Sequence, residues 1–290
     1  MNFIQQTIDQ LASANRCAYS PDGPWAAEPT SLACLALKIN NNHEAALRLA
    51  NQLVDSQESN GAVCALAERD TPAWTTSLAI LAWTTCDQVT FASHIKRAID
   101  WALVTQGKPA DRHPDVGHDP SILGWSWAAD THAWMEPTCM FVIALKAAGF
   151  HGHNRTREGV RMIADRLLPA GGCNYGNTMV LGQQMMPQVQ STGLAMLALA
   201  GEENKDPRVV ASLDYLQNHI RPETTTSSMC YGLLGLTAQG RRPQQATDYL
   251  RQAYGREMAS GTSEYKLALL LLAASEEKEL FPGIQSEATA

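Results

Sequence analysis

A phrase of eleven residues occurs twice in this chain, and its repetition limits the possible folds more than any other feature of the sequence. AEPTSLACLAL begins at Ala27 and MEPTCMFVIAL begins at Met135. Related segments, in which hydroxyl or amide residues lead into small and aliphatic ones, begin at Trp74, Gln190, Thr226 and Ser263. A helix that is apolar on every side is buried, so the sequence predicts a set of core helices.

Amphipathic segments alternate with these repeats. In the first of them, Ile4, Ile8 and Leu11 are spaced as one face of a helix. The amphipathic segments cover residues 3–14, 42–56, 90–106, 155–167, 206–219 and 243–256. Strand patterns are nearly absent. Amphipathic helices around buried helices predict an all-α fold, a closed double ring of about six helical hairpins (an α/α toroid).

The ring is expected to form a single domain over residues 1–275. An open solenoid is the alternative, but it would need polar capping repeats at its ends. Residues 276–290 are polar and small, which predicts a flexible tail.

The connections between the two kinds of helix carry a further signal. QESNGAV at 57–63, YSPDGPW at 19–25 and GGC at 171–173 are variations on Gln-x-x-x-Gly-x-Trp, in which glycine permits a sharp turn and the aromatic ring fills a gap between hairpins. In these motifs, residues 19 to about 274 resemble the prenyltransferase and squalene-cyclase repeat family. The chain is most similar to small bacterial members with phrases like GHDPSILGWSW, THAWMEPT and GGCNYGN. The resemblance implies an α/α toroid and an isoprenoid-type substrate.

The longest interruption of the repeat is residues 108–137. It contains three of the eight histidines, four aspartates and three of the seven tryptophans. A long loop in a compact fold is usually functional or disordered, and tryptophans argue against disorder. We expect this loop to fold over one mouth of the ring. The buried helices should run parallel, so that their N-termini form a polar rim above an apolar well.

Glu28 and Glu136 precede Pro29 and Pro137 at the start of the repeated phrase. A structural interpretation is that each carboxylate stabilises the N-terminus of its helix. A functional interpretation comes from the resemblance, because class II terpene cyclases carry a DxDD motif at the head of an inner helix and protonate an alkene or epoxide. The position of Glu136 is comparable, although the chain contains no DxD.

The resemblance therefore suggests Glu136 as a proton donor. A neighbouring group would have to keep this acid protonated near neutral pH. The sequence offers Asp119, His118, His132 and Asp130 as catalytic partners and does not choose among them.

Aromatic residues near the expected rim could bind the substrate. A carbocation is stabilised by π faces in a medium of low dielectric constant. The alternative for each ring is gap-filling between hairpins. The predicted substrate-binding residues are Trp74, Trp125, Trp127, Trp134, Tyr175, Gln190 and Glu28.

Composition excludes some classes of function. The formal net charge of −7 argues against a nucleic-acid partner. No 18-residue stretch is apolar enough to span a bilayer, and no basic region followed by an apolar run suggests a secretory signal. Seven scattered cysteines indicate reduced thiols and a cytoplasmic protein.

The sequence thus favours an enzyme that acts on an apolar, isoprenoid-type small molecule by acid-initiated cyclisation or rearrangement, without a cofactor or metal. One alternative is a non-catalytic toroid that binds a lipid or peptide or docks to a partner enzyme. A second is a protein similar to zinc-dependent prenyltransferases. Their Asp-x-Cys pair is absent, so zinc would need Cys173 together with His118 or His132.

Overall fold

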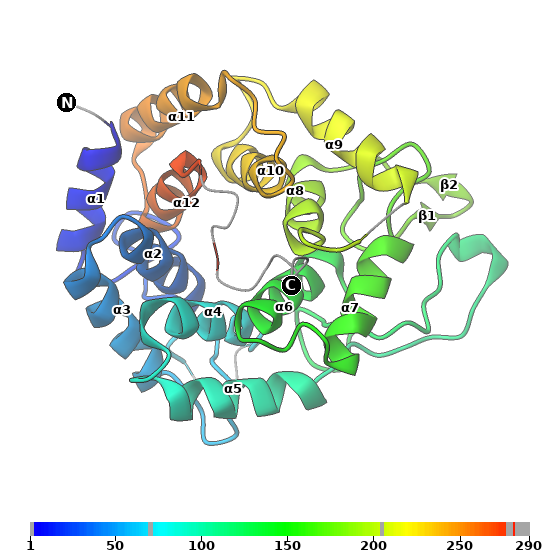
Figure 1. Cartoon of the computed structure of the whole chain (residues 1–290), viewed down its shortest axis with the longest axis horizontal. Coiled ribbons are helices and arrows are strands. Elements are labelled where there is room, and N and C mark those ends of the chain that lie inside the picture. Colours follow the sequence, from blue (N-terminus) through cyan, green and yellow to red (C-terminus); the bar gives the residue numbers. More distant parts are fainter. Residues whose placement is uncertain (1–2, 69–71, 204–205, 277–280, 282–290) are drawn as a thin grey trace, which may run out of the picture.

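The computed structural model describes residues 3–68, 72–203, 206–276 and 281, and within them helices form two concentric rings (Figure 1). The inner helices are α2 (Ala27–Ile39), α4 (Thr76–Asp87), α6 (Met135–Ala147), α8 (Val189–Ala198), α10 (Thr226–Ala238) and α12 (Glu264–Ala274). The outer helices are α1 (Phe3–Ser13), α3 (His43–Asp55), α5 (Ala92–Val104), α7 (Asn154–Asp165), α9 (Pro207–His219) and α11 (Ala246–Ser260). The predicted all-α toroid is confirmed.

Two small elements between α5 and α8 interrupt this plan. A 3-10 helix, η1, covers Pro114–Val116, and a short hairpin pairs β1 (Met179–Val180) with β2 (Gln183–Gln184). Both lie outside the rings, to the right in Figure 1. The repeat pattern did not predict either of them.

The inner ring is closed, because α12 packs against α2 as well as against α10. Two hydrogen bonds connect the segment before α2 to α12. The Ala18 amide donates to Glu264 Oε2 at 3.1 Å, and the Tyr265 amide donates to the Ala18 carbonyl at 3.3 Å. Closure excludes the open solenoid.

Helices α8 and α10 touch backbone to backbone. A Cβ atom built on Gly193 would lie 2.4 Å from the carbonyl oxygen of Tyr231, and one built on Gly235 would lie 2.4 Å from the carbonyl oxygen of Gly193. Real Cβ atoms do not approach other atoms this closely. The two glycines therefore permit the tight packing on this side of the ring.

A buried lysine holds α6 to the segment after α8. The Lys146 side chain is fully buried, and its Nζ donates to the carbonyl oxygens of Ala198 and Ala200 at 2.8 and 3.0 Å. Its charge is paired with Glu202 at 2.7 Å, and Arg157 pairs with the same carboxylate. Burial lowers the pKa of Lys146, and the ion pair opposes that shift. Lys146 is thus a structural cation.

The centre of the inner ring is apolar but nearly filled. Leucines from the inner helices and Phe281 line a residual cavity of about 30 Å³. The side chain of Phe281 is only 4% exposed. The interior is apolar, as the predicted well requires, but the remaining cavity is small.

The predicted tail at 276–290 lies mostly outside the described residues. Phe281, which is described, is buried. All seven cysteines are free and buried. Within the described part of the chain, the helices lack the length and apolarity needed to cross a membrane.

Candidate active site at the mouth of the inner ring

The repeated phrase brings its two glutamates to the same rim. Glu28 is in the first turn of α2 and Glu136 is in the first turn of α6. Their residues are 6% and 7% exposed. They lie near enough to each other for the charge of Glu136 to raise the pKa of Glu28. Two buried carboxyl groups therefore share the mouth of the ring.

Glu28 accepts a hydrogen bond from the Tyr19 hydroxyl to its Oε2 at 2.6 Å. Burial raises the pKa of Glu28 to about 7, although the bond from Tyr19 opposes the rise. The ring of Tyr19 lies 5.3 Å from that of Tyr265, and Tyr231 is buried close by in α10. Near neutral pH, Glu28 is thus divided between its acid and its carboxylate form.

Two side chains of α8 form hydrogen bonds with the carboxylate of Glu136. The Ser191 hydroxyl and the Gln190 amide donate to its Oε1 at 2.9 and 3.3 Å. Burial raises the pKa of Glu136, and these two bonds counteract the rise. The carboxylate form of Glu136 therefore has two donors that stabilise it.

Several predicted aromatic residues lie on the same rim. Trp74, just before α4, makes an edge-to-face contact with Trp127, with ring centroids 4.7 Å apart. Trp134 directly precedes α6 and is half-buried. Tyr175 is 49% exposed, and its carbonyl accepts from the amide of Met135 at 2.8 Å. The rings of these residues therefore lie at the mouth and are at least partly exposed to solvent.

Trp125 does not belong to this group. It is fully buried, its indole N–H donates to the Ala102 carbonyl at 3.0 Å, and the Arg155 guanidinium lies 3.6 Å from its ring centroid. Phe141 stacks on it at 5.1 Å. The prediction that Trp125 contacts substrate is wrong, because the ring fills a gap between hairpins.

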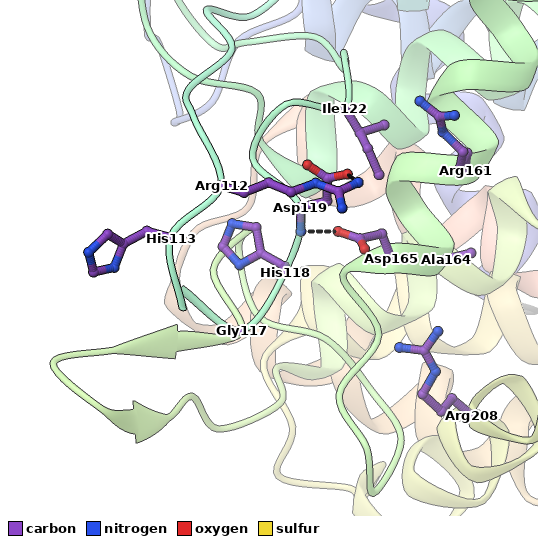
Figure 2. A pocket seen from close by; sticks show the side chains of 10 residues that line it. All are labelled: Arg112, His113, Gly117, His118, Asp119, Ile122, Arg161, Ala164, Asp165 and Arg208. Carbon is purple, nitrogen blue, oxygen red and sulfur yellow. Dashed lines mark hydrogen bonds and ion pairs between the residues drawn. The ribbon is translucent and has the colours of Figure 1, made fainter. Parts of the chain in front are cut away.

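The first part of the 108–137 loop runs outside the rings beside α7, so for this part the prediction that the loop covers the mouth is wrong (Figure 1). His118 contacts Thr178 at 3.1 Å, and Asp119 contacts Arg112 and Ser121. Both residues line a separate pocket of about 750 Å³ (Figure 2). They are therefore not the partners of Glu136.

Asp130 and His132 were the other expected partners of Glu136. Both are exposed; Asp130 has a positive φ of 62°, and the His132 ring lies 4.3 Å from that of Trp134. The hydrogen bonds to Glu136 come instead from Gln190 and Ser191.

Sequence reasoning missed Tyr19, Ser191, Tyr231 and Tyr265. A signal for three of them was present, because Tyr19 precedes α2 in its connection, Ser191 is in the first turn of α8, and Tyr265 is in the first turn of α12. Parallel inner helices bring such positions together. Tyr231 lies in the second turn of a helix that is apolar on nearly every side, where a core tyrosine gives no distinct pattern.

The hypothetical zinc ligands are not brought together. The Cys173 thiol is buried near Thr192, and burial raises its pKa to about 12. His118 is in the outer pocket and His132 is exposed. Among the described residues, no cluster of three His, Cys, Asp or Glu side chains could hold a metal ion.

Comparison with known proteins supports the fold. No family model and no curated protein matches the chain. An α-amylase from Clostridium perfringens has a similar structure, with a TM-score of 0.63 and 11% identity over 94% of this chain and 97% of the other. A protein from Actinoplanes has a TM-score of 0.60 and 14% identity over 93% and 97% of the two chains.

A type II terpene cyclase from Scytonema, in complex with its product merosterolic acid A, has a TM-score of 0.57 and 14% identity over 89% of this chain and 80% of that one. The terpene cyclase and the α-amylase are similarly distant. These likenesses show an α/α toroid. At such identities they show the fold alone.

Proposed function

We propose that this protein is an enzyme that uses Glu28 and Glu136 for acid-initiated chemistry on a small molecule bound at the mouth of the inner ring. The observation that carries the proposal is the buried carboxyl pair. An isolated helix-stabilising glutamate would gain most by remaining ionised beside the N–H groups of its helix. Burial instead favours the protonated form of both groups.

The hydrogen bonds favour a division of roles within the pair. Glu136 accepts from Ser191 and Gln190, which stabilise its negative charge. Glu28 has the pKa of about 7 and so holds a proton that it can transfer near neutral pH. We therefore assign the proton donor to Glu28 and the anionic partner to Glu136, the reverse of the role suggested by the resemblance.

An acid of this strength limits the substrate. A carboxylic acid with a pKa near 7 is a weak donor to an alkene carbon, but it can act on an oxygen atom whose basicity rises as its bond breaks. An isoprenoid epoxide or alcohol has such an oxygen. The half-buried rings of Trp74, Trp127 and Trp134 would then face the developing positive charge.

The filled interior limits the size of this substrate. The residual cavity of about 30 Å³ cannot hold an isoprenoid chain. The apolar part of the molecule would therefore lie across the mouth or displace Phe281 from the ring.

Glycoside hydrolysis is a second candidate, because it also uses two carboxyl groups, one of them a proton donor with a raised pKa. Glycoside hydrolysis is considered because the fold is similar to that of an α-amylase and to that of a glycosidase with 9% identity and a TM-score of 0.60. In this case the aromatic rings at the mouth would stack on sugar rings. Both candidates require the same proton donor.

The test is turnover by the wild type, Glu28→Gln and Glu136→Gln. One panel contains isoprenoid epoxides and alcohols of several lengths, followed by mass spectrometry, and the other contains maltooligosaccharides, followed by release of reducing sugar. Loss of the proton donor should lower turnover by about 10²–10⁴-fold. The exposed Glu223, changed to Gln, is the control for loss of charge.

Wild-type turnover retained by Glu28→Gln would refute the assignment of the donor. No turnover of either panel, together with saturable binding of an isoprenoid alcohol, would favour the non-catalytic lipid-binding alternative.

A further inference from the structure

The pocket outside the rings is formed by the loop that the repeat pattern leaves unexplained. It has a volume of about 750 Å³ and lies between residues 112–122, α7 and the start of α9. Figure 2 shows guanidinium groups entering it from three separate segments: Arg112 from the loop, Arg161 from α7 and Arg208 from α9. His113 points away from the others.

The acidic side chains of the pocket, Asp119 and Asp165, accept hydrogen bonds from residues of the loop. Asp119 accepts from Arg112 and, at 2.6 Å, from the Ser121 hydroxyl. These bonds hold the pKa of Asp119 well below its usual range. Asp165 accepts from the amide of Asp119 at 3.0 Å, as the dashed line in Figure 2 shows. Asp119 thus binds within the loop, and Asp165 fixes the loop against α7.

Arg161 and Arg112 have N–H groups that do not donate to an acceptor in the described part of the protein. Among the described residues, the ion-pair partner of Arg161 is Glu158, at 3.7 Å, which is too long for a hydrogen bond. Arg112 donates to Asp119 through Nη2, which leaves Nε and Nη1 for another acceptor. Arg208 is fixed by Asp206 and by the Leu167 carbonyl. These bonds fix the position of its guanidinium group, and Asp206 balances part of its charge.

The other groups at the pocket do not supply a competing anion. Burial and the nearby Arg166 lower the pKa of His118 to about 4, so this imidazole is neutral at neutral pH. Arg166 is 4% exposed and donates to the Gly176 carbonyl behind the pocket. Ile122 supplies an apolar side. The pocket thus combines three guanidinium groups and a neutral ring with the carboxylates of Asp119 and Asp165, which already accept hydrogen bonds from the protein.

We propose that this pocket binds a small, multiply charged anion of the phosphate or carboxylate type. Arginine suits both groups, because its planar N–H donors match their paired oxygen atoms. The pocket is concave and larger than a single phosphate, which fits an organic molecule with two or more anionic groups. The site is separate from the mouth and does not depend on the proposed reaction.

The test is isothermal titration of the full chain with pyrophosphate and with citrate, in buffers matched in ionic strength because exposed charges are screened by salt. Arg161→Gln removes the guanidinium group that has the fewest contacts with acceptors of the protein. Arg251→Gln is the matched control, because Arg251 is similarly exposed and pairs with Asp248 on α11, outside the pocket. Thermal unfolding of all three proteins checks that the variants fold.

The wild type should bind at least one of the two anions saturably. Arg161→Gln should weaken that binding by about tenfold or more, the effect of losing one charge-assisted hydrogen bond. Arg251→Gln should change it less than about twofold. Equal weakening by both variants, or no saturable binding of either anion by the wild type at millimolar concentrations, would overturn the proposal.

Discussion

Replacement of Glu28 by glutamine should stabilise the protein at alkaline pH. Burial raises the pKa of this carboxyl from 4.5 to about 7, so the folded state binds the proton more tightly than the unfolded state. The contribution of this proton to stability is full below pH 4.5 and is lost as the pH rises to about 7. Glutamine is neutral at every pH and can still accept from the Tyr19 hydroxyl.

The size of the gain follows from the two pKa values. At about 1.4 kcal/mol for each pH unit, the ionised carboxylate costs about 3 kcal/mol of unfolding free energy at pH 8. At pH 5 the cost is less than about 1 kcal/mol, because most folded molecules are protonated. Glu28→Gln should therefore gain about 3 kcal/mol over the wild type at pH 8 and little at pH 5.

The assay is urea unfolding of both proteins at the two pH values, followed by circular dichroism. Glu223→Gln removes the same charge from an exposed position and should change stability by less than about 0.5 kcal/mol at either pH. The reasoning would be refuted if Glu28→Gln had the same effect at both pH values, or if it destabilised the protein at pH 8. Loss of turnover with a gain of stability would be the signature of a strained catalytic acid.

Three further predictions concern the ring itself. Glu202→Gln leaves Lys146 buried without its counter-charge and should lower the free energy of unfolding by about 3 kcal/mol in urea titrations. Gly193→Ala places a methyl group against the backbone of α10 and should cost about 2 kcal/mol or more, whereas Gly152→Ala, with open space around it, should cost much less by the same measurement. Phe281→Ala should lower the unfolding free energy by about 3 kcal/mol and increase binding of a hydrophobic dye, as the interior opens; unchanged dye binding would contradict this role for Phe281.

The fold could be predicted because each repeat has a recognisable pattern of apolar and polar residues. Segments such as MEPTCMFVIAL are apolar on nearly every side, which predicts a buried helix. The rim followed from the same pattern, because parallel inner helices bring their first turns together. The pattern therefore predicts Glu28, Glu136 and Gln190 at one rim, where Gln190 donates to Glu136 and the charge of Glu136 acts on Glu28.

The course of the 108–137 loop and the positions of its tryptophans could not be predicted, because they depend on contacts between distant segments. Nothing in the composition of the 108–137 loop tells whether it crosses the mouth or runs beside α7, because that choice is made by hydrogen bonds such as the one from the Asp119 amide to Asp165. Trp125 and Trp127 are two residues apart, yet one is buried under Arg155 and the other contacts Trp74. Local sequence does not distinguish such neighbours.

The contact between α12 and α2 also affects how the chain is made. Residues 27–39 are synthesised well before the helix that covers their flank, which is completed at residue 274. During synthesis the apolar side of α2 must therefore stay exposed or be covered by a chaperone until α12 has emerged. A translational stop before α12 would leave open edges at α2 and α10, so that the smallest unit able to bury all its inner helices is the complete circle.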